Sequence, residues 1–203
     1  MSERAPEVVL ARHGETEWST QGRHTGRTDI PLTPAGEAQA AALPGMLGRW
    51  NFGLVLCSPL RRAQQTCALA GFRDRAHLRD DLMEWAYGDL EGHTLEEWHA
   101  LHPGWDIWEQ GCPGGETIEQ VGDRADRVIA EISAAGVDTV VFAHGHLLRT
   151  LLVRWLGFPA KTARHFTMMT AAIGVLGRDR DDRVLEQWNV TGRPPGEGSS
   201  ARI

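Results

Sequence analysis

The chain has 203 residues, of which 41% are hydrophobic, and its 21 Lys and Arg against 27 Asp and Glu give a formal net charge of −6. These values are typical of a globular protein and exclude bulk disorder. The acidic balance argues against a general nucleic-acid binder and, taken as an average, against an anionic substrate.

Membrane proteins and disulfide scaffolds are disfavoured as well. No stretch reaches the roughly 20 apolar residues that span a bilayer, and the N-terminal residues show no signal-peptide pattern. The three cysteines, Cys57, Cys67 and Cys112, are too few for a disulfide framework and are wrongly spaced for a zinc site. We therefore expect a reduced, cytoplasmic protein with no membrane partner.

Short apolar runs alternate with helical patterns in the first half of the chain. Residues 7–11 and 54–57 are expected to be buried strands, and 77–82 a weaker strand, because Arg79, Asp80 and Asp81 interrupt its apolar run. A helix is expected from Thr33-Pro34 to about Arg49. Ser58-Pro59 is expected to cap a second helix, which runs to about Ala70.

The second half continues the same alternation. Helices are expected over 94–101, over 118–134 with Thr117 as cap, and over 146–156; a strand is expected over 138–143, and a closing hairpin over 171–177 and 183–190. This order predicts an α/β fold, a three-layer α/β/α sandwich with a mostly parallel sheet. Residues 1–190 form one predicted domain, and 191–203, rich in Pro, Gly and Ser, a disordered tail.

Charged side chains follow the predicted parallel strands, at the edge where such sheets bind ligands. Arg12-His13 follows the first strand, Arg62 the second, Glu84 the third and His144 the fourth. If the four strands are parallel, these side chains gather at one edge of the sheet. The negative average charge therefore conceals a local cationic cluster.

Such a cluster suits a phosphate ester. Two arginines beside two histidines favour a multiply charged anion, and lysine should fail at Arg12 and Arg62 because only a guanidinium grips phosphate with two prongs. Like charges keep a neighbouring imidazole neutral, and a neutral ring nitrogen is a nucleophile toward phosphorus. The other ring nitrogen must then donate a hydrogen bond, which fixes the tautomer. A protonated Glu84 would supply the proton that the leaving oxygen needs.

An ordered set of motifs resembles the histidine phosphatase superfamily, the phosphoglycerate-mutase-like proteins. The matching segments are Arg12-His13-Gly14-Glu15-Thr16 and residues 32–38, 58–66, 84–92, 113–117 and 141–149. The resemblance covers nearly the whole chain except the tail. It implies a phosphoglycerate-mutase-like fold and a phosphomonoesterase that needs no metal and no other cofactor.

The resemblance also implies a role for each matching residue. His13 would take the phosphoryl group as phosphohistidine, and Arg12 and Arg62 would hold the phosphate oxygens. His144 would bind and stabilise the transferring group. Glu84 would protonate the leaving alcohol and then activate the water. The substrate pocket would be lined by Ser19, Arg23, His24, Thr25 and Gly26.

Residues 93–112 favour a phosphatase over a mutase. This segment lacks the paired arginines with which mutases hold the second anionic group of their substrate. Together with the motifs around Trp18, Thr25 and Trp105, it looks most like the subgroup that contains sedoheptulose bisphosphatase and acid phosphatase. The expected substrate is a small soluble phosphate ester, with a sugar phosphate or bisphosphate as one option.

Other functions stay open on the sequence alone. A phosphoglycerate mutase is the nearest, and a non-catalytic module that binds phosphorylated ligands is the next, although binding does not require Glu84. A metallohydrolase ranks last because His144-Gly145-His146 lacks a nearby carboxylate or cysteine set, and His99 and His102 fit a solvated helix face. Nucleic acid is not expected as a partner. The oligomeric state is open, with a homodimer as one option.

Overall fold

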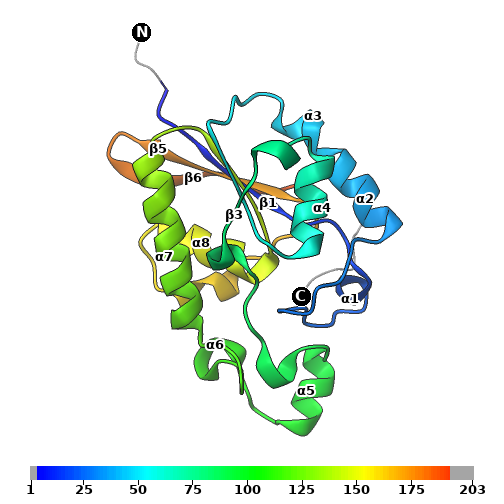
Figure 1. Cartoon of the computed structure of the whole chain (residues 1–203). Helices are drawn as coiled ribbons and strands as arrows, with labels where there is room; N and C mark the ends of the chain where they lie inside the picture. Colours follow the sequence, from blue (N-terminus) through cyan, green and yellow to red (C-terminus); the bar gives the residue numbers. More distant parts are fainter. Residues whose placement is uncertain (1–3, 193–203) are drawn as a thin grey trace.

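A six-stranded sheet forms the centre of the computed structural model, which describes residues 4–192 (Figure 1). The strand order is β3-β2-β4-β1-β5-β6. The strands are β1 (Val8–Arg12), β2 (Leu54–Cys57), β3 (His77–Leu78), β4 (Thr139–Ala143), β5 (Ile173–Asp179) and β6 (Asp182–Val190). The first four are parallel, whereas β5 and β6 form an antiparallel hairpin at one side. The predicted α/β class is confirmed, while most of the predicted tail, 193–203, lies outside the described residues.

Alternate residues of the central strands contribute to two hydrophobic cores. Val8 and Leu10 pack in the core under α7 (Ile118–Ala135) and α8 (Gly145–Trp155). Val9 and Ala11 pack in the core under α3 (Leu43–Leu47) and α4 (Arg61–Leu69). Because strand side chains point alternately to the two faces, the sheet is covered on both sides. Figure 1 shows α7 and α8 on one face and α2 to α4 on the other.

The remaining helices are short. They are α1 (Glu17–Thr20), α2 (Pro34–Ala41), α5 (Leu95–Leu101) and α6 (Ile107–Gln110), with 3-10 turns at Arg73–Arg75, Asp80–Leu82, Gly88–Leu90 and Ala160–His165. Thr16, Thr94 and Thr117 each begin a helix with reciprocal capping hydrogen bonds. Within residues 4–192, no helix has the length and apolar composition needed to cross a membrane.

Three predicted element boundaries are wrong. The helix expected up to Arg49 is broken at Ala42 into α2 and α3, because Pro44 has no N–H to continue the hydrogen-bond ladder of α2. Ser58-Pro59 does not cap α4, which begins at Arg61 with Leu60 as its N-cap residue. The third strand ends at Leu78, and the charged residues after it form a 3-10 turn instead.

The loop after β1 passes α2 at backbone contact distance. A Cβ on Gly14 would lie 2.3 Å from the carbonyl oxygen of Gly36, and one on Gly36 would lie 2.1 Å from that of Glu15. The amide of Gly14 donates to Thr66 Oγ1 in α4 at 3.1 Å. Because neither glycine has a side chain, the two backbones can pack this closely. This contact and the hydrogen bond to Thr66 hold the loop that carries His13.

We predict that Gly36→Ala destabilises the fold, because the added methyl group meets main-chain atoms that cannot move alone. Overpacking of this kind costs about 1–3 kcal/mol, measurable by urea unfolding. Gly45→Ala is the matched control, since a Cβ at this position in α3 meets no atom within 4 Å. Alanine in a helix is expected to raise stability there by up to about 1 kcal/mol. Equal stability of the Gly36 variant and the wild type would contradict the packing argument.

Candidate active site

A narrow pocket lies at the carboxyl ends of β1 and β4. Its wall is formed by Arg12, His13, Ser19, Thr25, Glu84, Tyr87, Gly145, His146, Arg149 and Met168. The two strands are neighbours, and the amide of His13 donates to the carbonyl of Ala143 at 3.0 Å. The rings of His13 and His144 consequently lie close together, with centroids 5.2 Å apart. The structure thus brings together the residues that follow the strands.

His13 is held as one neutral tautomer. Its Nδ1 lies 2.7 Å from the carbonyl oxygen of Gly14. Because a carbonyl only accepts, Nδ1 must carry the proton, which leaves a lone pair on Nε2 of the neutral ring. Burial, reinforced by the charges of Arg62 and Arg12, holds the pKa of His13 well below the usual 6.5. Near neutral pH His13 therefore offers an unprotonated ring nitrogen.

His144 is fixed by its two hydrogen bonds. Arg62 Nε donates to its Nδ1 at 3.1 Å, so the ring proton must lie on Nε2, which is 2.7 Å from Ser58 Oγ. Burial first, and then the charge of Arg62, keeps the pKa of His144 well below its usual value. The serine that was expected to cap α4 instead accepts this hydrogen bond.

Arg62 is fully buried and contacts main-chain oxygens. Its Nη atoms donate to the carbonyls of Thr25, Gly26 and Thr28 at 2.9–3.0 Å. Burial lowers the pKa of Arg62 to about 10, which still leaves it charged at neutral pH. Among the residues that the structure describes, neither Arg62 nor His144 borders the pocket directly. The ring of His144 lies beside that of His13, and Arg62 donates to His144. Both residues therefore lie behind the pocket wall, where the charge of Arg62 helps to lower the pKa of His13.

Arg12 keeps an unused hydrogen-bond donor in the pocket wall. Its Nη1 donates to the carbonyl of Met168, whereas its buried Nε has no partner among the described residues. A Cβ on Gly145 would lie 3.3 Å from this Nε, so the glycine allows the guanidinium to approach the N-terminus of α8. A buried donor without a partner is costly. This arrangement therefore fits an anion bound beside α8.

Glu84 is the carboxylate of the pocket. Its oxygens accept from the amides of Trp85 at 3.0 Å, His146 at 3.1 Å and Leu147 at 3.0 Å. The last two amides lie in the first turn of α8, where N–H groups have no partner within the helix. Glu84 is 5% exposed. The residue lies in the same pocket as His13, as expected for an acid and a nucleophile that share one substrate.

The other predicted pocket residues are only partly brought to this site. Ser19 and Thr25 line the pocket, and His24 packs edge-on against Tyr87 with centroids 4.9 Å apart. Gly26 contributes its carbonyl to Arg62 instead. Arg23 lies outside, because its guanidinium pairs with Glu97 of α5 at 2.8 Å. Arg23, which was expected to line the pocket, is therefore directed to α5 and is not among the lining residues.

Five lining residues were not predicted as site residues, namely Tyr87, Gly145, His146, Arg149 and Met168. Tyr87 hydroxyl lies 2.6 Å from Nδ1 of His146, and Arg149 donates to the carbonyl of Phe166 at 2.7 Å. Burial lowers the pKa of Arg149 to about 10. The spacing of three residues puts His146 and Arg149 on one face of a helix. That spacing was available in the sequence, whereas the approach of Tyr87 depends on tertiary packing.

Comparison with known proteins gives consistent matches. A family profile described as histidine phosphatase superfamily (branch 1) matches residues 8–191. An acid phosphatase of Mycobacterium tuberculosis is 39% identical over 198 residues, which cover 96% of this chain and 97% of that protein. A sedoheptulose 1,7-bisphosphatase of Saccharomyces cerevisiae is 39% identical over 184 residues, covering 75% and 68%. The solved structure of a Mycobacterium tuberculosis open reading frame superimposes with a TM-score of 0.88 at 39% identity, covering 94% and 100%.

We predict that stability falls as the pH is lowered from 7.5 to 5.5. Burial is the largest cause of the lowered pKa of His13, His24, His144 and His146. Below pH 6.5 the unfolded chain takes up protons that the folded chain does not, so acid favours unfolding. Each histidine contributes up to about 1.4 kcal/mol per pH unit in that range.

Urea unfolding at several pH values measures this dependence. His146→Asn should reduce the slope of the unfolding free energy against pH by about 1.4 kcal/mol per pH unit, which corresponds to one proton fewer taken up on unfolding. The matched control His99→Asn, at an exposed position of α5, should leave the slope unchanged. A free energy of unfolding that is constant or rises toward pH 5.5 would be incompatible with neutral buried histidines.

Proposed function

The chain belongs to the histidine phosphatase superfamily as a phosphatase of small phosphorylated metabolites, and we propose that its reaction passes through a phosphohistidine at His13. The observation that carries this proposal is the tautomer of His13. Nδ1–H is bound to the Gly14 carbonyl, so the lone pair of Nε2 belongs to a residue of the pocket wall. Its neutral state, maintained among arginines, is the one that a nucleophile requires.

In the first step Nε2 of His13 forms a bond to phosphorus and the ester P–O bond breaks. Glu84 acts as the general acid and gives a proton to the leaving alcohol oxygen. Arg12 can donate its unpartnered Nε–H to a phosphoryl oxygen. Arg62 has most of its donors occupied by carbonyls and His144, and it therefore contributes mainly its buried positive charge to the developing transition state.

His144 does not line the pocket in the resting structure and must rearrange for its proposed role. Its Nε2–H donates to Ser58 in the resting structure. The same N–H can transfer its hydrogen bond from the serine to a phosphoryl oxygen without any change of protonation. Arg62 keeps the tautomer needed for this donation. His144 thus stabilises the transferring group as a neutral donor.

In the second step water replaces the histidine. Glu84, now a carboxylate, takes a proton from water as the water oxygen bonds to phosphorus and the P–N bond breaks. Inorganic phosphate leaves and neutral His13 is restored. Release of inorganic phosphate distinguishes this reaction from isomerisation of a phosphoglycerate. Activity that a chelator removes and a divalent cation restores would instead indicate a metallohydrolase.

The proposed substrate is a sugar phosphate or bisphosphate. The names of the similar acid phosphatase and sedoheptulose 1,7-bisphosphatase support this class. Arg149, buried in the pocket wall with a carbonyl as its hydrogen-bond partner, supports a substrate with a second polar group. A cytoplasmic location and a homodimer stay predictions.

We predict that His13→Ala lowers turnover of p-nitrophenyl phosphate by about 10³-fold or more, because the nucleophile is removed. Brief incubation with a ³²P-labelled ester should leave acid-labile label on the wild type and none on this variant. His99→Ala, at an exposed histidine of α5, should behave as wild type. Full activity of the His13 variant would eliminate the phosphohistidine mechanism.

We predict that Glu84→Gln distinguishes substrates by their leaving group. The value of kcat/KM covers the steps up to alcohol release and should fall by about 10²-fold or more for glycerol 3-phosphate. It should fall much less for p-nitrophenyl phosphate, because nitrophenolate leaves without a proton. Glu119→Gln, at an exposed position of α7, is the control. Equal losses on the two esters would remove Glu84 from the role of acid.

A further inference from the structure

Glu84 lies on a segment without regular secondary structure, residues 84–87, between two 3-10 turns. The backbone of this segment is not held by a strand or helix, yet its carboxyl must meet the substrate accurately. We propose that Arg124 on α7 is a positioning residue that fixes the main chain at Glu84, and with it the carboxyl. This inference rests on the proposed role of Glu84 as general acid.

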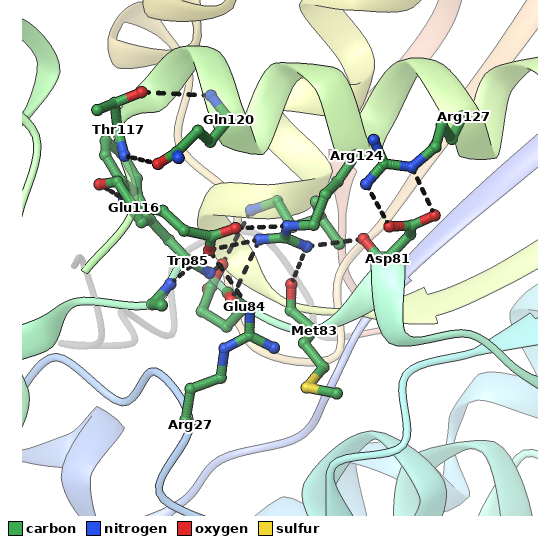
Figure 2. Close-up of polar contacts among 12 residues, drawn as sticks. Arg27, Asp81, Met83, Glu84, Trp85, Glu116, Thr117, Gln120, Arg124 and Arg127 are labelled. Carbon is green, nitrogen blue, oxygen red and sulfur yellow. Dashed lines mark hydrogen bonds and ion pairs between the residues drawn. The ribbon is translucent and has the colours of Figure 1, made fainter.

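The guanidinium of Arg124 binds main-chain carbonyls of the residues before Glu84 and of Glu84 itself. Its Nη1 donates to the carbonyls of Asp81 at 2.7 Å and Met83 at 2.8 Å, and its Nη2 lies 3.4 Å from the carbonyl of Glu84. Figure 2 shows these bonds below α7. Arg124 therefore holds three carbonyls where the chain enters the segment 84–87.

Glu116 fixes the guanidinium from the other side. Its carboxylate accepts from Arg124 Nε at 2.8 Å and Nη2 at 2.9 Å, a two-pronged pair. The same carboxylate accepts from the amide of Ala86 at 2.9 Å, and the carbonyl of Glu116 accepts from Trp85 Nε1 at 2.8 Å. Arg124 and Glu116 together hold the chain immediately before and after Glu84.

Backbone packing independently supports the same clamp. A Cβ on Gly115 would lie 2.1 Å from the carbonyl oxygen of Ala86, and Gly88, at φ +52°, would place a Cβ 2.0 Å from that of Pro113. The amide of Glu116 also donates to the carbonyl of Ala86 at 2.9 Å. Residues 113–116 therefore lie directly against the segment that follows Glu84.

All donors of Arg124 are used in this arrangement. A guanidinium has five N–H groups, and five contacts are made, two to Glu116 and three to carbonyls. Arg124 is 7% exposed and is not among the residues that line the pocket. No donor is left for a substrate, so any effect on catalysis must pass through Glu84 and its neighbours.

Arg127 provides a matched control on the same helix. It lies three residues further along α7 and pairs with the carboxylate of Asp81 at 2.6 Å. Its side chain is 58% exposed. The two arginines thus bind the same residue differently: Arg127 holds the side chain of Asp81, whereas Arg124 holds main-chain oxygens up to Glu84.

The test compares Arg124→Lys with Arg127→Lys on an alkyl and an aryl ester. Lysine keeps the charge but cannot bind Glu116 and three carbonyls at once. Misplacement of a reacting group by about 1 Å can cost up to 10²-fold in rate. We expect Arg124→Lys to lower kcat/KM at least tenfold more for glycerol 3-phosphate than for p-nitrophenyl phosphate, and Arg127→Lys to leave both within about twofold.

A double variant shows whether the effect passes through Glu84. If Arg124 acts by positioning that carboxyl, Arg124→Lys should add no further leaving-group discrimination in the Glu84→Gln background. Equal losses on both esters, or undiminished discrimination in that background, would overturn the proposal. If Arg124→Lys does not fold, Glu116→Gln weakens the same clamp and should give a smaller discrimination in the same direction; equal losses would again contradict it.

Failure of the proposed mechanism would look different. Glu84→Gln alone would then show no discrimination between the esters, or His13→Ala would remain active. In either case the mechanism fails whatever Arg124→Lys does. A normal result for both of those variants with equal losses in Arg124→Lys contradicts only the positioning role.

Discussion

The buried charge of Arg62 determines much of the arrangement of the pocket. Carbonyl oxygens of residues 25–28 and one nitrogen of His144 accept its hydrogen bonds. These partners are neutral dipoles, so they orient the guanidinium without cancelling its charge. The Nε–H of Arg62 fixes the tautomer of His144, and the uncancelled charge helps to lower the pKa of both His144 and His13 and attracts an anion. Arg62 thus holds the loop of residues 25–28, helps to keep the two histidines neutral and favours an anionic ligand.

Arginine performs a similar task at several positions around the pocket. Arg12, Arg62, Arg124 and Arg149 each donate to main-chain carbonyls of residues distant in the sequence. A planar group with five donors can join loops that have no regular hydrogen bonding of their own, which a lysine ammonium cannot do with the same geometry. Among the 21 basic residues only Lys161 is lysine. At these buried positions the hydrogen-bonding geometry requires the guanidinium itself.

The sequence alone predicts the ends of β1 and β4 well, because apolar runs locate these strands and their parallel pairing brings Arg12, His13 and His144 to one edge. It also contains the signal for the break at Pro44, although the longer helical pattern around that proline obscures it. The roles of Arg23 and Arg124 are not visible in this way. Both depend on which carboxylate or carbonyl lies nearby after folding, and for Arg124 those partners come from residues 81–84 and 116. The net charge of −6 is similarly uninformative about a pocket that concentrates arginine.

The central claim is that His13 is neutral in the resting protein and carries its proton on Nδ1. Long-range ¹H–¹⁵N NMR of the histidine rings, with His13 assigned by its loss in His13→Ala, measures both properties directly. At pH 6 the account predicts a neutral His13 ring with a protonated Nδ1 and a bare Nε2 nitrogen. A protonated imidazolium, or a neutral ring with its proton on Nε2, would contradict it.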